Sequence, residues 1–448
     1  MKKVLLVHPE DSRTKFDWKG IIENECLDLE CIMTVLKESE YDATIFDVQI
    51  EKESFKEYLK DKMFDVCYIT GRIMQENFMI EYAKEFKDRC NGLVIVGGIH
   101  AELNYERFFL GEIDYVLSGA NYYNIPNIIE NNHIEDIANL SYKKDNRWII
   151  NEKKAVDINK EPKPDRTYFY NHPHNYAYLD LPHIAWVKSA YSCPYRCSFC
   201  IRNKMNNNNY SRRNVLDFVG EIENIKSDNI YIADDDFLFD EKYLKEFIRL
   251  IKEKDIKKTY ICYGRSDFII NHEEIMKDLK AIGFHYIMVG FEDIRDNRLK
   301  AYNKQNSINN NKKCIEICHK VGLHVMAMFI IGLDYKRKDF YALYKWIKDH
   351  KLSHVAITIY TPEMGLENYK DYKDRMISYN PSHYDYLHLV AKPDYLSARE
   401  FYFHYYILLI KLFLKGQREG IYDFLDYKDY IKTFIKIMIK GKRDGDDE

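Results

Sequence analysis

Residues 184–200, IAWVKSAYSCPYRCSFC, join a short apolar run to three closely spaced cysteines. The run Ile184–Ala190 has the length and composition of a buried β-strand. Cys193, Cys197 and Cys200 follow it with the spacing Cys-x3-Cys-x2-Cys. Three thiolates on one loop can bind three irons of a [4Fe–4S] cluster, whose usual ligands are cysteine thiolates. The fourth iron would then have no ligand from this loop and could bind another molecule.

The spacing alone leaves three other interpretations open. A structural zinc site needs four ligands, typically from two separated Cys-x2-Cys pairs, and no second pair lies nearby. A ferredoxin-like electron carrier needs a fourth cysteine in a matching run. The three cysteines could also be buried by coincidence, because free cysteine packs as a small hydrophobe.

The remaining cysteines indicate a reducing compartment rather than a disulfide framework. They are scattered through helix-like or strand-like apolar segments: Cys26, Cys31, Cys67, Cys90, Cys262, Cys314 and Cys318.

Five further strand patterns follow the cysteines, each separated from the next by a helical pattern. They cover residues 229–233, 258–263, 286–291, 324–331 and 355–360. With the strand at 184–190, they predict an α/β domain over residues 183–382 that forms a partial (β/α)6 barrel. Such a barrel has its site at the carboxyl ends of its strands. Polar residues stand there: Asp234, Asp235, Asp236, Arg265, Glu292, Asp293 and Thr361.

The cysteine motif and these strand ends resemble the radical S-adenosylmethionine (SAM) superfamily. Val289-Gly290-Phe291-Glu292 resembles the family's Gly-Leu-Glu turn, and Thr361-Pro362-Glu363-Met364-Gly365 resembles its Thr-Pro-x-x-Gly stretch. The resemblance implies that SAM binds the open iron of the cluster. It also implies a set of SAM contacts: Glu292 at the amino group, Arg265 at the carboxylate or ribose, the backbone near Phe199 at adenine, and Asp234 and Gly290 beside them. A single carboxylate or arginine at a strand end is more often a solvated loop residue, and a triple Asp can be a charged turn.

The first 135 residues alternate short apolar strands with helical patterns, which predicts a doubly wound, Rossmann-like domain. Such sheets bind ligands at the carboxyl ends of their strands. Thr70, Gly97-Gly98 and Ser118-Gly119 stand at those ends. Glycine lets the backbone approach a large flat ligand closely. The same glycines could equally serve only to make tight turns.

Residues 94–119 resemble the last part of the cobalamin-binding domain that precedes many radical SAM cores, as in class B methyltransferases and anaerobic magnesium-protoporphyrin cyclases. A Gly-Gly-x-His-Ala turn and the strand after it match, whereas Ser118-Gly119-Ala120-Asn121 stands where the family has Gly-Glu-Gly-Glu. The resemblance implies cobalamin contacts from Thr70, Gly97, Gly98, His100, Ser118 and Gly119. The module contains no Asp-x-His-x-x-Gly pattern. The resemblance therefore also implies that no histidine of that pattern lies beneath cobalt, and it does not assign this role to His100.

Two further segments complete the predicted organisation. Residues 136–182 form a proline-rich linker with a hairpin of strands 140–142 and 148–150. Residues 383–448 form a helical region in which Ser397 caps a helix over 398–415, and a second, basic amphipathic helix covers 427–440. Similar tails cover the substrate cavity in cobalamin-domain radical SAM proteins. The basic helix could lie on a membrane surface, although packing against the barrel is the favoured interpretation.

Composition narrows the class of partner. The 448 residues carry a net charge of −4 with interspersed signs, which argues against a nucleic-acid-binding footprint. No stretch has the apolar length of a membrane span and the start does not resemble a signal peptide, so we predict a cytoplasmic protein.

The resemblance implies a function at the level of reaction class. SAM would be cleaved to a 5′-deoxyadenosyl radical, with cobalamin-dependent methylation of an unactivated carbon as the favoured outcome. A radical rearrangement, ring formation or oxidation is the alternative, and a non-catalytic cluster-binding or cobalamin-sensing protein is a third. The predicted partners are a small-molecule, lipid or peptide substrate and a flavodoxin or ferredoxin as electron donor.

Overall fold

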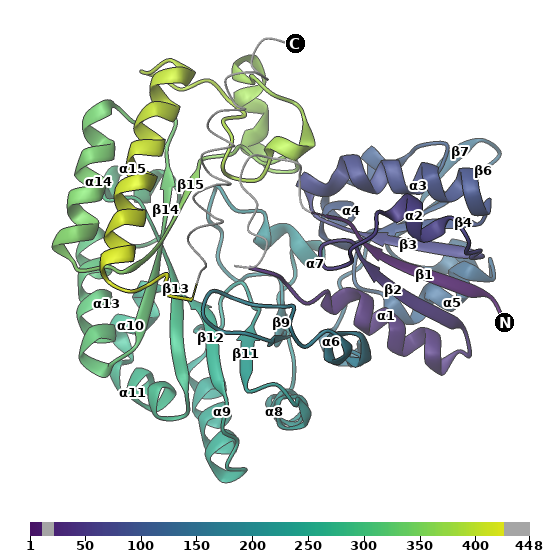
Figure 1. Ribbon diagram of the computed structural model, residues 1–448, viewed down its shortest axis with the longest axis horizontal. Coiled ribbons are helices and arrows are strands. Elements are labelled where there is room, and N and C mark those ends of the chain that lie inside the picture. The colour runs from purple at the N-terminus through teal and green to yellow at the C-terminus, as the bar shows by residue number, and fades with distance from the viewer. Residues whose placement is uncertain (11–21, 425–448) are drawn as a thin grey trace.

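The computed structural model describes residues 1–10 and 22–424. Two α/β units lie side by side, the first on the right and the second on the left of Figure 1. The first contains a seven-stranded sheet and the second a six-stranded sheet with a separate two-stranded ribbon. This arrangement confirms the predicted α/β class.

The first sheet has the strand order β2-β1-β3-β4-β5-β6-β7. Its first five strands are parallel: β1 (Lys3–His8), β2 (Asp42–Asp47), β3 (Val66–Thr70), β4 (Leu93–Gly97) and β5 (Tyr115–Leu117). Helices α1 (Leu27–Glu38) and α5 (Ile125–Ile129) contribute to the core on one face. Helices α2 (Phe55–Leu59), α3 (Glu76–Cys90) and α4 (Gly98–Asn104) contribute to the core on the other. The doubly wound domain is confirmed.

The predicted hairpin belongs to this sheet and not to a separate linker. Strands β6 (Leu140–Lys144) and β7 (Arg147–Ile150) are antiparallel, and β6 pairs with β5 through Tyr142 opposite Tyr115. Asp145 and Asn146 have φ of 49° and 61°, as the two central residues of a type I′ turn require. The hairpin satisfies the backbone groups at the open edge of β5, so the first unit extends to Ile150 rather than ending at residue 135.

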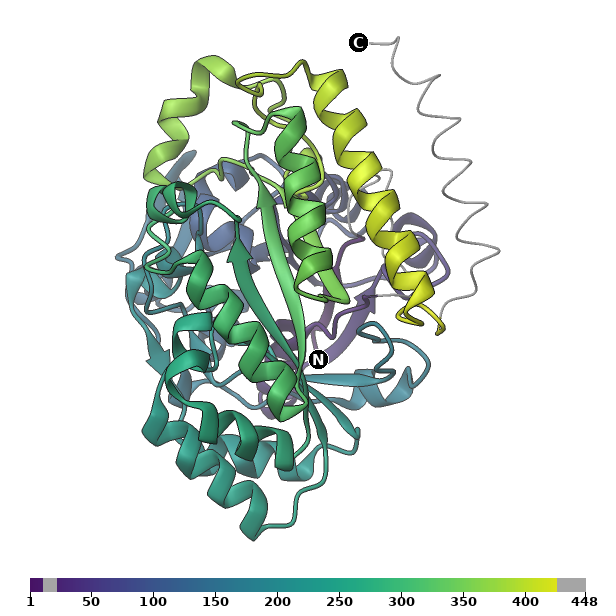
Figure 2. The ribbon, with the colours of Figure 1, turned by 90° about the vertical axis from the view of Figure 1, so that its left-hand side faces the viewer.

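The second sheet is a partial barrel of six parallel strands in the order β15-β14-β13-β12-β11-β8. The strands are β8 (Ile184–Val187), β11 (Asn229–Ile232), β12 (Thr259–Gly264), β13 (Phe284–Glu292), β14 (His324–Ile331) and β15 (His354–Ile359). The longer helices between them are α8 (Val215–Asn224), α9 (Glu241–Glu253), α11 (Glu273–Ala281), α13 (Ile308–Val321) and α14 (Arg337–Asp349). Figure 2 shows helices lying in front of the strands, on the outer side of the barrel. The predicted (β/α)6 architecture is confirmed.

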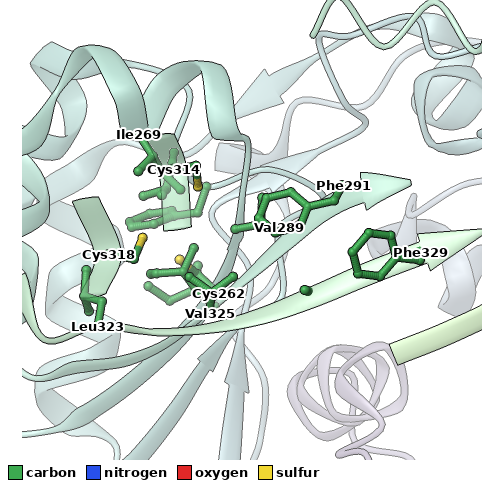
Figure 3. Close-up of a cluster of buried hydrophobic side chains, with 14 of the residues drawn as sticks. Cys262, Ile269, Val289, Phe291, Cys314, Cys318, Leu323, Val325 and Phe329 are labelled. Atoms are coloured by element: carbon green, nitrogen blue, oxygen red, sulfur yellow. The ribbon is translucent and has the colours of Figure 1, made fainter. Parts of the chain in front are cut away.

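The barrel core lies between this sheet and the helices. Cys314 and Cys318 of α13 face Cys262, Val289 and Val325 of the strands within an apolar cluster (Figure 3). Burial raises the pKa of the Cys262 and Cys314 thiols well above the ordinary value, so both remain neutral. These cysteines therefore act as small hydrophobes, as the sequence indicated.

Helix α15 (Ala398–Arg418) continues the barrel beyond β15. Ser397 and Glu400 form a reciprocal capping box at its start, which confirms the predicted N-cap. Its apolar side, which includes Phe401 and Tyr405, is buried in the barrel core. The second predicted helix, 427–440, lies outside the described residues. Among the residues that the structure describes, no helix is both long and apolar enough to cross a membrane.

A buried arginine ties the two units together. Arg166, from the segment between them, donates hydrogen bonds to the carboxylates of Glu25 and Glu221, the latter at 2.7 Å, and to the carbonyl of Trp186 at 2.7 Å. Glu25 precedes α1, whereas Glu221 and Trp186 belong to the barrel. Because a guanidinium binds several acceptors in a fixed plane, this contact fixes how the units meet.

Candidate active site

The three cysteines occupy a loop at the carboxyl end of β8. The short strand β9 (Ala190–Tyr191) leads into it and pairs with β10 (Ser211–Arg212). Ser192, with φ of 66°, turns the chain into the loop, and its hydroxyl donates to the carbonyl of Arg202 at 3.1 Å. On the other side, the Ser198 amide donates to the carbonyl of Tyr302 at 3.0 Å. The loop is therefore anchored at both ends.

Asp234 holds the backbone that leads into the cysteine loop. Its carboxylate accepts hydrogen bonds from the amides of Ser189 at 2.7 Å and Ala190 at 3.0 Å, and from the Ser189 hydroxyl. These bonds occupy a buried side chain that the sequence offered as a SAM contact. Its geometry is that of a positioning residue.

The donor set of the loop fits a cubane cluster. Cys193, Cys197 and Cys200 are half-buried and free of disulfides. Burial raises the pKa of the Cys193 and Cys200 thiols to about 12, so iron binding must displace their protons. The Cys197 sulfur lies 3.9 Å from Nη1 of Arg265, which places a cation beside the cluster position.

Arg265 is fixed from three sides at the end of β12. Its guanidinium donates to Asp267 at 3.0 and 2.9 Å and to the carbonyl of Lys304 at 2.7 Å. Its central carbon lies 3.8 Å from the ring centroid of Tyr195, inside the cysteine loop. Arg265 is thus where the sequence expected it, beside the loop, with Nη1 directed at Cys197.

Glu292 is paired with a lysine that the sequence did not nominate. The Lys304 ammonium donates to Oε1 of Glu292 at 2.7 Å, and both side chains are buried. Burial favours the neutral amine, but the nearby Glu292 and Cys197 outweigh it and keep the pKa of Lys304 above its ordinary value. A Cβ at Gly290 would lie 2.1 Å from that carboxylate oxygen, so the glycine makes room for the pair.

Asp236 is the carboxylate that remains open. It is 4% exposed, and neither of its oxygens has a hydrogen-bond partner among the described residues. Burial raises its pKa to about 7, against the charges of Arg265 and Lys304. It lies close enough to Cys193 for its charge to raise that thiol's pKa. The sequence indicated the run Asp234–Asp236 as a whole, whereas the fold gives each carboxylate a different contact. Asp235 pairs with Arg202 at 3.3 Å.

Phe199 begins an aromatic wall at the end of the loop. Its ring lies 5.1 Å from that of Tyr302, which stacks on Tyr360 at 5.9 Å between centroids. The Asn368 amide donates to the carbonyl of Ser198 at 3.2 Å. Tyr302 and Tyr360 are buried in the barrel core, so these rings support Phe199.

At the edge of the first sheet, the two glycines are required by packing. A Cβ at Gly97 would lie 1.9 Å from the Tyr68 hydroxyl, and one at Gly98 would lie 2.1 Å from Oγ1 of Thr70. Gly98 also has φ of 85°. The tight turn is therefore sufficient to explain both glycines.

The other side chains of this edge that the sequence predicted as cobalamin contacts also form hydrogen bonds within the protein. Nε2 of His100 lies 2.5 Å from the buried Glu76 carboxylate. The Ser118 hydroxyl donates to the carbonyl of Asn139 at 2.9 Å, and the adjacent Gly119 has φ of 147°. These residues shape the edge and do not project functional groups from it.

The carboxyl edges of the two sheets meet through one segment, residues 363–392, which we call the cap. Met364 and Val390 of the cap pack with Ile73, at the end of the β3 turn. Beyond the cap, the Glu102 carboxylate of α4 accepts a hydrogen bond from the Asn206 amide, just past the cysteine loop. Figure 1 shows the N-terminus on the side of the first unit away from the barrel, so β1 runs toward the barrel.

Comparison with known families agrees with this geometry. Residues 187–347 match the sequence model of the radical SAM superfamily. The chain contains a radical SAM domain. The match begins at the last residue of β8, runs through β14 and includes the cysteine loop, Asp236, Arg265 and the Glu292–Lys304 pair.

The radical SAM domain and the unit before it have relatives of similar organisation. The chain is 23% identical over 415 residues to the hopanoid C-3 methylase of Methylococcus capsulatus, which covers 89% of this chain and 78% of that protein. It is 24% identical over 327 residues to the anaerobic magnesium-protoporphyrin IX monomethyl ester cyclase of Cereibacter sphaeroides, which covers 69% and 53%.

A solved structure shares the fold of both units. The radical SAM methyltransferase TsrM from Kitasatospora setae, solved with cobalamin and a [4Fe–4S] cluster bound, superposes with a TM-score of 0.65 at 16% identity. The superposition covers 84% of this chain and 79% of TsrM. At this identity the likeness establishes the shared fold.

Proposed function

We propose that this radical SAM enzyme cleaves SAM reductively and uses cobalamin to methylate an unactivated carbon. The observation that carries the proposal is the meeting of two carboxyl edges. The cysteine loop stands at one edge, the Gly97-Gly98 turn stands at the other, and the cap contacts both. One substrate between them would be within reach of a cofactor on each side.

Cys193, Cys197 and Cys200 would hold three irons of the cluster. When bound, the cluster supplies an electron that breaks the C5′–S bond of SAM, which gives methionine and a 5′-deoxyadenosyl radical. We assign the ammonium group of SAM to Asp236, because its carboxylate is buried and has no partner among the described residues. Glu292 then orients Lys304 rather than contacting that ammonium directly. The aromatic wall at Phe199 receives adenine.

Cobalamin is assigned to the edge of the first sheet, where it would supply the transferred methyl group. The backbone at Gly97-Gly98 and Gly119 would support the corrin, because the side chains of His100 and Ser118 are committed to internal bonds. The shared fold of TsrM, which holds cobalamin, supports this assignment.

The test is an anaerobic assay of cluster-reconstituted protein purified from cobalamin-fed cells. With dithionite and SAM carrying a CD3 methyl group, we expect 5′-deoxyadenosine release, corrin absorbance in the protein and CD3 transfer to cobalamin. Cys197→Ala should abolish 5′-deoxyadenosine release, whereas Cys90→Ala, outside the loop, serves as the matched control. Protein that never retains a corrin would refute the methylation proposal.

The departure at Ser118–Asn121 favours a second candidate, a radical rearrangement, cyclisation or oxidation without methyl transfer. Ser118 and Gly119 border a small cavity of about 70 Å³ that is also lined by Lys153 and Lys204. A cavity of this size can hold a few water molecules but is too small for a corrin side chain. Release of 5′-deoxyadenosine from corrin-free protein would support this candidate.

Partners and location are part of the same proposal. A flavodoxin or ferredoxin would supply the electron, and the substrate would be a small molecule, lipid or peptide. All ten cysteines are free, which suits a reducing, cytoplasmic environment. Any membrane contact of residues 427–440 concerns a segment outside the described residues.

A further inference from the structure

The cap holds a buried carboxylate that neither the cluster nor SAM requires. Glu363 follows β15 at the carboxyl edge of the barrel and is 3% exposed. Among the described residues, Tyr386 is the side chain that donates a hydrogen bond to it, through the phenolic hydroxyl to Oε1. Carrying a carboxylate into a protein interior costs free energy unless it gains a partner. The one neutral hydroxyl of Tyr386 offsets only part of that cost.

The position of Glu363 is central to the site. Arg202, two residues beyond Cys200, is close enough for its charge to act on both Glu363 and Tyr386. On the other side, a Cβ at Gly365 would lie 3.7 Å from Oδ1 of Asn104, in α4 of the first unit. Glu363 therefore stands between the cysteine loop and the first unit. Under the proposed function, a substrate must lie in that same interval.

Its hydrogen-bond donor is held in a strained conformation. Tyr386 has φ of 62°, in the left-handed region that residues other than glycine rarely adopt. Its carbonyl accepts from the amide of Ile359 at 2.7 Å, at the end of β15, while its hydroxyl is tied to Glu363. Strain of this kind persists where the surroundings over-determine it, and it concentrates at ligand sites.

The guanidinium of Arg202 does not act on Glu363 alone. Nε of Arg202 is 3.3 Å from Asp235, so one guanidinium is shared by two carboxylates. Burial raises the pKa of Glu363 despite Tyr386 and Arg202, so a cationic partner would offset the cost of its charged form. Radical cleavage of SAM needs no acid or base from the protein, so this charge is left for the substrate.

We propose that Glu363, positioned by Tyr386, is the substrate-recognition residue and binds an ammonium or other protonated nitrogen on the substrate. The inference rests on the proposed function and deepens it by naming a substrate class. A charge-assisted hydrogen bond to a buried carboxylate would favour a cationic ligand over a neutral one of equal shape by about tenfold.

The experiment compares three probes of matched shape: n-hexylammonium, 1-hexanol and hexanoate. Each is titrated calorimetrically, without oxygen or reductant, into cluster-reconstituted protein with SAM. We expect n-hexylammonium to bind about tenfold more tightly than 1-hexanol and hexanoate to bind most weakly. Glu363→Gln should reduce the preference for ammonium to about that of the alcohol, and Tyr386→Phe should reduce it in part. Glu367→Gln, an exposed carboxylate of the same segment, is the matched control.

A second readout places the probe in the reaction cavity. With dithionite, perdeuterated n-hexylammonium should transfer deuterium to 5′-deoxyadenosine, as one C–D bond breaks homolytically and the deuterium joins C5′ of the radical. Equal binding of ammonium and alcohol, or a preference that survives Glu363→Gln, overturns the inference. Protein that releases 5′-deoxyadenosine without any ammonium preference loses the inference alone. Protein that binds ammonium through Glu363 but never cleaves SAM keeps the recognition site and loses the proposed function.

Discussion

The ammonium of Lys304 lies 2.7 Å from the Glu292 carboxylate, and both side chains are buried beside the cysteine loop. Removing one member of a buried ion pair leaves an uncompensated charge, which typically costs about 3–5 kcal/mol. Lys304→Met should therefore lower the free energy of unfolding by about that amount. Lys300→Met, an exposed position in the same region, should change it little. Urea denaturation of the two variants decides this, and equal stabilities would contradict the pairing.

Asp236→Asn should separate binding from stability. The variant loses the charge that we assign to the ammonium of SAM, so SAM affinity should fall by about tenfold or more. The free energy of unfolding should not fall, because burial raises the pKa of Asp236 to about 7 despite the charges of Arg265 and Lys304, and asparagine removes the cost of burying a charge. Binding is measured by titrating SAM into the reduced cluster and following its paramagnetic resonance spectrum. Asp255→Asn, an exposed carboxylate, is the control, and unchanged SAM affinity in Asp236→Asn would refute the role.

Gly98→Ala tests the turn at the edge of the first sheet. The new Cβ would meet Oγ1 of Thr70 at 2.1 Å in a backbone with φ of 85°. Backbone strain of this kind costs roughly 1–3 kcal/mol before the steric overlap is counted. Gly111→Ala, where no atom lies within 4 Å of the new Cβ, should stay within about 0.5 kcal/mol of the parent. Thermal unfolding of both variants provides the comparison.

His354 makes part of the protein's free energy of unfolding sensitive to acid, at a position far from the cysteine loop. Its Nε2 lies 3.2 Å from the Tyr286 hydroxyl at the amino ends of the barrel strands. Burial, with the charge of His324 next in importance, lowers its pKa to about 4. The unfolded chain therefore binds a proton at a higher pH than the folded one. The stabilisation is fully present above about pH 6.5 and is lost as the pH falls toward 4.

His354→Gln should flatten this part of the stability profile. Chemical denaturation at pH 7 and pH 5 measures it: the parent should lose more free energy of unfolding between the two than the variant. His133→Gln, at an exposed position, should keep the parent's slope. Identical slopes for His354→Gln and the parent would contradict the assignment.

Local patterns in the sequence determined the scaffold of this protein. The apolar run before Cys193 and the three-cysteine spacing located the loop, because a strand and the loop after it depend on neighbouring residues. The capping signal at Ser397 likewise predicted the start of α15, since its partner Glu400 is three residues away. The alternation of strands and helices likewise predicted two α/β units, because each element depends on residues that are close in the chain.

Tertiary structure alone decided which polar groups meet. Glu292 pairs with Lys304, Asp236 has no hydrogen-bond partner among the described residues, and Glu363 accepts a hydrogen bond from Tyr386. The partner and the burial of each carboxylate depend on strand ends and loops that are distant in the chain. Desolvation then sets whether a carboxylate is neutralised, paired or left open for a ligand, and no local spacing encodes that.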